Sequence, residues 1–195
     1  MDARSALRKK LREYRAKLSL HDQTVASQEI TQRLIQDPRF QKSQHVAAYI
    51  AINQEVDPEL IIKTAWENDK NCYLPVLQKK QLMFSLYKKH MLLIKNQFNI
   101  PEPPLLPESI IQPCDLDIVL VPLLGFTNNS ERLGMGGGFY DRSFSFLLND
   151  IRPAKPYLIG LAYEWQKVES FESSAWDVPL NAVATEENFY VNTNL

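Results

Sequence analysis

The hydrophobic and polar positions near the start of the chain follow the period of a helix. Leu7, Leu11, Tyr14 and Leu18 are spaced by three and four residues, which is typical of the apolar face of a helix over residues 4–18. Seven lysines and arginines between positions 4 and 17 occupy most of the remaining surface. We therefore expect an amphipathic basic helix whose charged side is mainly solvated.

A second helix is predicted directly after the first. Ser19 followed by Asp22 has the spacing of an N-cap, apolar residues recur at helical intervals up to Leu34, and Asp37-Pro38 ends the segment. The chain thus opens with a helical pair.

From residue 46 the pattern changes to short apolar runs separated by helical stretches. The expected strands cover residues 46–50, 72–76, 82–86, 118–122, 157–162, 183–184 and 189–191. Between the first two, a helix from Asp57-Pro58 to about Asn68 would face the sheet with Leu60, Ile61, Thr64 and Ala65. This alternation is typical of a largely parallel sheet, although 82–86 follows a short polar turn and fits an antiparallel hairpin partner.

Residues 98–113 contain prolines at positions 101, 103, 104, 107 and 113. Because proline lacks a backbone N–H, this segment favours an extended loop over a helix or a central strand. It could link two domains, but the apolar strands on both sides need the same core. We therefore predict an α/β fold in which residues 1–195 form a single three-layer α/β/α domain around a mostly parallel sheet, with the N-terminal helical pair attached.

The segment from Arg132 to Arg142, RLGMGGGFYDR, holds four of the six glycines in the chain. Glycine lets main-chain N–H groups approach a ligand closely, and the segment lies between a predicted buried strand and a helix expected over 139–148. It lacks the Lys-Ser/Thr ending of a Walker A loop and the later acidic residue of a dinucleotide-binding fold. The sequence therefore predicts phosphate binding in another mode, while a glycine turn needed only for helix packing stays an alternative.

Two features next to this loop bear on its chemistry. A carboxylate directly after a phosphate-binding loop, here Asp141, is well placed to be a ligand of Mg²⁺. The two cysteines and three histidines have no metal-binding spacing, so we expect neither a zinc site nor a disulfide framework.

Composition limits which binding partners and which cellular compartment are expected. The net charge of −1 gives no overall attraction to nucleic acid or anionic lipid. No run approaches the roughly 18 apolar residues of a membrane span, and the start of the chain is unlike a signal peptide. We expect a cytoplasmic monomer with small-molecule substrates and without nucleic-acid or membrane partners.

The ordered set of short motifs along the chain resembles the 5-formyltetrahydrofolate cyclo-ligase family, also called 5,10-methenyltetrahydrofolate synthetases. The motifs that carry the resemblance lie at residues 4–8, 49–57, 74–75, 100–103, 117–122, 132–142, 159–163 with Gln166, 176–180 and 185–186. The glycine segment is the most specific of them. Three positions depart from the family pattern: Arg4 where Lys is usual, Thr127 where Asp is frequent, and Ser130 where Gly is frequent.

The resemblance implies a reaction that uses ATP as co-substrate and Mg²⁺ as cofactor to convert 5-formyltetrahydrofolate into 5,10-methenyltetrahydrofolate, ADP and phosphate, through a phosphorylated formyl group. It implies the following sites. ATP contacts are Arg4, Ser5, Ala6, Leu7, Arg8, Arg132, Leu133, Gly134, Met135, Gly136, Gly137, Gly138, Phe139 and Tyr140; folate contacts are Ile50, Glu55, Met135, Gly136, Gly137, Gly138 and Phe139; metal ligands are Asp141 and Asp177; catalytic residues are Arg132, Tyr140 and Glu55. Taken without the resemblance, Glu55 would be a helix-start carboxylate and Asp177 a turn residue.

Two other functions compete with this hypothesis. One is a sugar-phosphate isomerase or coenzyme A transferase-like enzyme on a similar fold, because a fold does not determine its chemistry. The other is an RNA-binding module, suggested by the basic first helix, although no aromatic platform accompanies the charge.

Overall fold

The computed structural model describes residues 2–149 and 151–195. The helices are α1 (Ala3–Arg15), α2 (Leu20–Ile35), α3 (Pro38–Lys42), α4 (Glu59–Glu67) and α5 (Phe139–Ser143), with 3₁₀ turns η1 (Pro107–Ser109), η2 (Pro113–Asp115), η3 (Ser145–Leu148) and η4 (Glu164–Gln166). The strands are β1 (His45–Ala47), β2 (Asn71–Gln78), β3 (Gln81–Leu86), β4 (Ile94–Lys95), β5 (Pro101–Glu102), β6 (Ile110–Ile111), β7 (Ile118–Pro122), β8 (Gly125–Phe126), β9 (Arg132–Leu133), β10 (Tyr157–Leu161), β11 (Ala182–Ala184) and β12 (Phe189–Val191).

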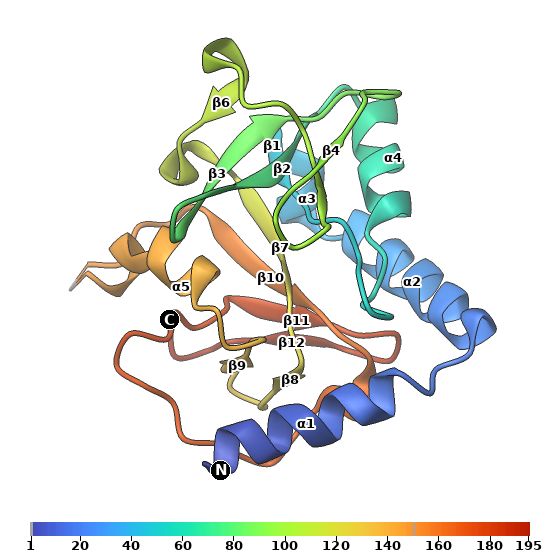
Figure 1. The fold of residues 1–195 in the computed structure, drawn as a ribbon, viewed down its shortest axis with the longest axis vertical. Helices are drawn as coiled ribbons and strands as arrows, with labels where there is room; N and C mark the ends of the chain where they lie inside the picture. The colour runs from blue at the N-terminus through green and yellow to red at the C-terminus, as the bar shows by residue number, and fades with distance from the viewer. Residues whose placement is uncertain (1, 150) are drawn as a thin grey trace.

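One eight-stranded sheet runs through the molecule in the order β12-β11-β10-β7-β1-β2-β3-β6 (Figure 1). The five strands from β11 to β2 are parallel, whereas β12, β3 and β6 are antiparallel additions at the two edges. The predicted α/β fold with a mostly parallel sheet is confirmed, as is the antiparallel hairpin of β2 and β3.

Helices α2 and α4 cover one face of the sheet, and Figure 1 shows both on the side opposite α5. Ile30 and Leu34 of α2 are fully buried and belong to the same apolar cluster as Val46 and Leu120 of the sheet. The predicted start of α2 is confirmed, because the Ser19 hydroxyl accepts the N–H of Asp22 at 3.1 Å.

The buried side of α4 differs from the prediction by a small rotation. Ile61, Ile62 and Ala65 are buried, whereas Leu60 is 37% exposed. Residues i, i+1 and i+4 share one side of a helix, so the placement of Leu60 against the sheet was wrong and Ile62 takes that role.

The other face is covered by α5 and η3, which complete the third layer. Phe144 and Leu147 from this segment lie in one apolar cluster with Val119, Leu158 and Val183 of the sheet. The expected continuous helix over 139–148 is wrong, since α5 ends at Ser143 and a 3₁₀ turn follows. The Ser143 hydroxyl donates to the Phe139 carbonyl and accepts the Leu82 N–H, which ties this last turn to the β2–β3 hairpin.

Two more segments depart from the expected elements. The strand expected over 46–50 ends at Ala47, because Tyr49 leaves the sheet and its hydroxyl donates to the Val56 carbonyl at 2.6 Å. The proline-rich segment is not only a loop, since β6 pairs with β3 and forms the edge of the main sheet. This location agrees with the tolerance of sheet edges for neighbouring prolines.

None of the helices within residues 2–149 and 151–195 combines the length and the apolar character needed to cross a lipid bilayer.

Gly160 lies in the middle of β10, where a side chain has no room. A Cβ there would come within 2.6 Å of Leu123 Cδ2 and 2.7 Å of Leu180 Cδ1. We predict that Gly160→Ala lowers the free energy of unfolding by about 1–3 kcal/mol, as overpacking of a buried core does. Urea denaturation measures this change, and a wild-type midpoint would contradict it.

Candidate active site

A cavity of about 1020 Å³ opens at the carboxyl ends of the parallel strands β1 and β7, between the glycine segment and the β4–β5 region. This end of a parallel sheet is where α/β proteins commonly bind ligands. Its lining includes most of the residues predicted for the site: Arg4, Arg8, Ile50, Glu55, Arg132, Gly134, Met135, Gly136, Gly137, Gly138, Phe139, Tyr140, Asp141 and Asp177. Segments far apart in sequence thus meet around one space.

Four predicted ATP contacts do not line this cavity: Ser5, Ala6, Leu7 and Leu133. Leu133 is fully buried and packs with Leu11 and Leu124, and Leu7 lies against the same cluster. These apolar side chains therefore hold α1 against the β8–β9 hairpin.

The β8–β9 hairpin also separates the glycine loop from β7, so the glycine segment does not follow the buried strand directly.

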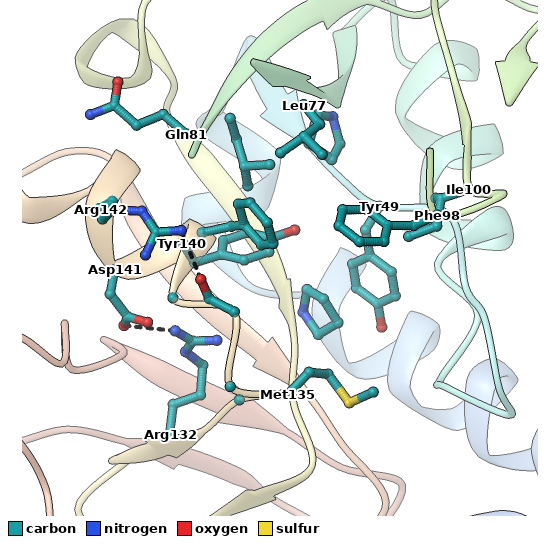
Figure 2. A pocket seen from close by; sticks show the side chains of 18 of the residues that line it. Tyr49, Leu77, Gln81, Phe98, Ile100, Arg132, Met135, Tyr140, Asp141 and Arg142 are labelled. Carbon is teal, nitrogen blue, oxygen red and sulfur yellow. Dashed lines mark hydrogen bonds and ion pairs between the residues drawn. The ribbon is translucent and has the colours of Figure 1, made fainter. Parts of the chain in front are cut away.

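Arginine side chains hold the carbonyl groups of the glycine loop, residues 134–138. Arg8 Nε donates to the Gly134 carbonyl at 2.9 Å and Arg12 Nη2 to that of Met135 at 3.1 Å. Arg142 Nη2 donates to the Gly137 carbonyl at 2.7 Å, a contact drawn in Figure 2. Within the described residues, the N–H groups of 134–138 donate no hydrogen bond to the protein. Four of the five loop carbonyls, all except that of Gly136, thus accept a hydrogen bond from the described residues, while the loop N–H groups are unused.

The chain direction through the loop requires glycine at two positions. Gly136 has a φ of 101°, and Gly138 has a φ of 63° with ψ 19°, in the left-handed region. Gly138 is also the N-cap of α5, and its conformation turns the chain into that helix.

Two carboxylates at the cavity wall are each paired with an arginine. Asp141 Oδ1 is 2.7 Å from Arg132 Nη2 (Figure 2), and Asp177 Oδ2 is 2.8 Å from Arg4 Nη1. The two are brought together because the Val178 N–H also donates to Asp141 Oδ1. In the described part of the chain, the second oxygen of each carboxylate, Asp141 Oδ2 and Asp177 Oδ1, accepts no hydrogen bond from the protein.

These carboxylates do not form a closed metal site by themselves. Within the residues that the structure describes, no group of three or more His, Cys, Asp or Glu side chains is arranged to hold a metal ion. Two cavity-lining carboxylates, each with one oxygen that accepts no hydrogen bond from the described residues, nevertheless suit Mg²⁺, which usually takes one or two protein carboxylates and completes its shell with water and phosphate oxygens.

Glu55 enters the cavity from a tight loop after β1. It is 7% exposed, and its Oε2 accepts the Ile52 N–H at 3.2 Å. Burial raises the pKa of Glu55, while the charge of Arg15 and the Ile52 N–H lower it, with burial the larger effect. Glu55 does not serve as a helix-start carboxylate, because Asp57 Oδ1 accepts the Glu59 N–H at the start of α4.

Aromatic rings form the centre of the cavity. Figure 2 shows Tyr140 extending into it, with Tyr49 and Phe98 across from it. Burial raises the pKa of Tyr140 far above its ordinary value, so its hydroxyl keeps its proton. The Arg132 guanidinium lies 5.6 Å from the centre of the same ring. This side of the cavity offers flat apolar surfaces next to one hydroxyl and one cation.

The first helix contributes more to the site than its sequence indicated. Arg4, Arg8, Arg12 and Arg15 all contact other segments of the protein. Four of the seven basic residues, Lys9, Lys10, Arg12 and Lys17, are exposed as expected, but the prediction missed the burial of Arg15. Arg15 is only 2% exposed. The spacing of these arginines by four, four and three residues is itself a helical stripe, and it is the signal that could have revealed them. Trp176, which lines the cavity and is 70% exposed, carried no such signal.

Comparison with known proteins gives one consistent result. A family model described as the 5-formyltetrahydrofolate cyclo-ligase family matches residues 1–186. The chain is 36% identical to a 5-formyltetrahydrofolate cyclo-ligase of Haemophilus influenzae, covering 91% of this chain and 94% of that protein. It is 33% identical to the enzyme of that name from Escherichia coli strain K12, over 90% and 96% of the two chains. The NMR structure of an Aquifex aeolicus 5,10-methenyltetrahydrofolate synthetase matches 100% of this chain and 95% of its own, with a TM-score of 0.84 and 29% identity.

The left-handed conformation of Gly138 gives a test of the loop geometry. We predict that Gly138→Ala destabilises the fold by about 1–2 kcal/mol, because a Cβ is disfavoured in this region. Gly138→Asn is the matched variant and should cost less, since asparagine tolerates left-handed dihedrals and is a good N-cap. Thermal unfolding of both variants measures the difference, and equal melting temperatures would argue against the described conformation.

Proposed function

The chain belongs to the 5-formyltetrahydrofolate cyclo-ligase family, and we propose that it carries out the family reaction with ATP and Mg²⁺ in the cavity described above. It is an enzyme with 5-formyltetrahydrofolate cyclo-ligase activity. The observation that best supports the ATP-dependent mechanism is the glycine loop: its N–H groups are unused, and the loop and its adjacent arginines line the same cavity as the buried carboxylate of Glu55.

The chemistry explains why ATP is needed. The formyl group is an amide, and its oxygen is a poor leaving group. In the proposed reaction that oxygen attacks the γ-phosphorus and the bond to ADP breaks. The neighbouring nitrogen then adds to the activated carbon and loses its proton, and the carbon–oxygen bond breaks to release phosphate. The protein contributes mainly by positioning the two substrates and neutralising charge.

The phosphate groups fit the end of the cavity formed by the glycine loop and the arginines. The N–H groups of residues 134–138 are available as donors, and Arg4, Arg8 and Arg132 lie along the wall. Helix α5 has only five residues, so its dipole adds little and the N–H groups and guanidinium groups carry the binding. Arg132 is the cation placed to stabilise charge on the transferred phosphoryl group.

Asp141 and Asp177 are the residues that would hold Mg²⁺, through the carboxylate oxygens that accept no hydrogen bond from the described residues. When bound, the ion neutralises phosphate charge and orients the phosphates for in-line transfer. Arg132 and Arg4 hold the opposite oxygens of these carboxylates and so fix their direction.

The folate ring fits the part of the cavity lined by Ile50, Glu55 and Phe139. A carboxylate offers a fork of two acceptors, which suits the N–H groups of a pterin. Apolar side chains of the lining would bury the ring. Tyr140 lines the same cavity beside Arg132, and its protonated hydroxyl would serve as a donor near the reacting atoms.

The two alternative functions have less support. The matches to cyclo-ligases extend over nearly the whole chain, which favours this reaction over a sugar-phosphate isomerase or a coenzyme A transferase-like enzyme. The RNA-binding hypothesis depended on a free basic helix, but the four arginines of α1 are engaged in contacts within the protein.

An absorbance assay tests the proposal directly. Purified protein with 5-formyltetrahydrofolate should form the absorbance of methenyltetrahydrofolate only when ATP and Mg²⁺ are both present. Product formed equally well without ATP would contradict the phosphorylation step, and absence of product under all conditions would contradict the function.

Asp141→Asn tests the metal assignment. The amide keeps an oxygen that can accept from Arg132 but loses the negative charge. We predict that the Mg²⁺ concentration for half-maximal activity rises at least about tenfold, as expected when a metal site loses a carboxylate or its support. Asp115→Asn, which removes an exposed carboxylate that does not line the cavity, is the control. An unchanged Mg²⁺ titration in Asp141→Asn would show that the metal is held elsewhere.

A further inference from the structure

Arg15, the last residue of α1, is a buried cation next to the cavity that does not line it. Its side chain is 2% exposed, and Nη1 lies 3.6 Å from Glu55 Oε1. The same nitrogen donates to the Leu123 carbonyl at 3.3 Å. A buried ion pair of this kind is costly to form in a protein and often adds no net stability compared with apolar residues. Because stability does not account for this ion pair, its position beside the proposed folate subsite indicates a role in ligand binding.

The loop that carries Glu55 is held in an unusual conformation. Asn53 and Gln54 have φ angles of 49° and 58°, both in the left-handed region that is uncommon for residues other than glycine. The Tyr163 hydroxyl donates to the Gln54 carbonyl at 3.1 Å, and the Glu55 N–H donates to the Ile52 carbonyl at 3.0 Å. Two strained residues persist only when their surroundings fix them, and such positions are concentrated at functional sites.

The two oxygens of Glu55 are oriented from opposite sides. Oε2 accepts the Ile52 N–H from its own loop, and Oε1 faces Arg15 from α1. Arg15 does not line the cavity whereas Glu55 does, so the side chain through which Arg15 most directly reaches a ligand there is Glu55.

We propose that Arg15 is a positioning residue for the folate subsite, which holds Glu55 ionised and aimed into the cavity and thereby sets the affinity for 5-formyltetrahydrofolate without touching it. This inference rests on the proposed function, since it takes Glu55 as the acceptor for the pterin N–H groups.

The charges around Glu55 agree with this role. Burial raises the pKa of Glu55, and Arg15 is the strongest influence that opposes the rise. Tyr49, Tyr140 and Tyr163 also face the carboxylate, but burial raises their own pKa values, that of Tyr163 to about 12, so they stay neutral when Glu55 titrates. Loss of the Arg15 charge should therefore move the protonation of Glu55 to higher pH.

The test measures equilibrium binding of 5-formyltetrahydrofolate by calorimetry, without ATP, across a pH series. Arg15→Met should weaken binding about tenfold or more near neutral pH, as expected when a carboxylate acceptor loses its charge or direction. The loss of affinity on acidification should also begin at higher pH than in wild type. Arg15→Lys keeps the charge, so its pH dependence should stay close to wild type. Lys9→Met removes an exposed charge from the same helix and should change neither property.

A double-mutant cycle separates this role from a structural one. Glu55→Gln alone should weaken binding, and adding Arg15→Met to it should cost little more, because Arg15 acts only through Glu55. The double variant also removes both charges, so it avoids the unpaired buried charge that could unfold a single variant. Calorimetric ATP titration of each variant should stay within about twofold of wild type by the same additivity argument.

The outcomes distinguish failure of this inference from failure of the proposed function. If wild type does not bind 5-formyltetrahydrofolate, the function is wrong. If wild type binds it but Arg15→Met retains affinity and pH dependence, or if Arg15→Met weakens binding equally in the Glu55→Gln background, the positioning role is wrong.

Discussion

The arginine side chains along one side of α1 connect the parts of the site to each other. Each reaches a different segment: Arg4 contacts Asp177, Arg8 and Arg12 contact the glycine loop, and Arg15 contacts Glu55. None of these segments has enough regular structure to fix itself. The N–H groups of the glycine loop donate no hydrogen bond within the described residues. Asp177 lies in a long connection between η4 and β11. Contacts from this one helix therefore fix the positions of the three loops relative to each other.

Charge is distributed around the cavity in a way that limits its cost. Burying a guanidinium is unfavourable unless it is paired or hydrogen-bonded. Arg132, Arg4 and Arg15 are each placed beside a carboxylate, and Arg8, Arg12 and Arg142 donate to carbonyl groups of the loop. Each guanidinium thus has a partner, yet these six arginines outnumber the three carboxylates and leave an excess of positive charge around the cavity. An anionic ligand with a divalent cation would complete this arrangement.

The sequence predicted the parts of the fold that depend on local period. The strands at Ile118–Pro122 and Tyr157–Leu161 are nearly continuous apolar runs, as expected for strands buried on both faces. Arg15 was assigned to solvent because a helical period cannot tell which of two adjacent stripes faces the protein. At the break after Ser143, the Ser143 hydroxyl accepts the Leu82 N–H of β3, a tertiary contact that a local period does not encode. Ser130, one of the positions that depart from the motif described above, has a φ of 56°, a left-handed conformation that glycine adopts most readily.

The edges of the main sheet affect how readily the protein pairs with other chains at high concentration. One edge strand, β6, is two residues long and is flanked by prolines on both sides. The other edge strand, β12, is three residues long. A sheet edge is a template for backbone pairing with another chain in proportion to its length and flatness. Pairing of another chain with β6 or with β12 therefore gains few hydrogen bonds, although β6 itself covers only Phe84 and Ser85 of β3. The short length of these two outermost strands thus limits cross-chain β-pairing at them.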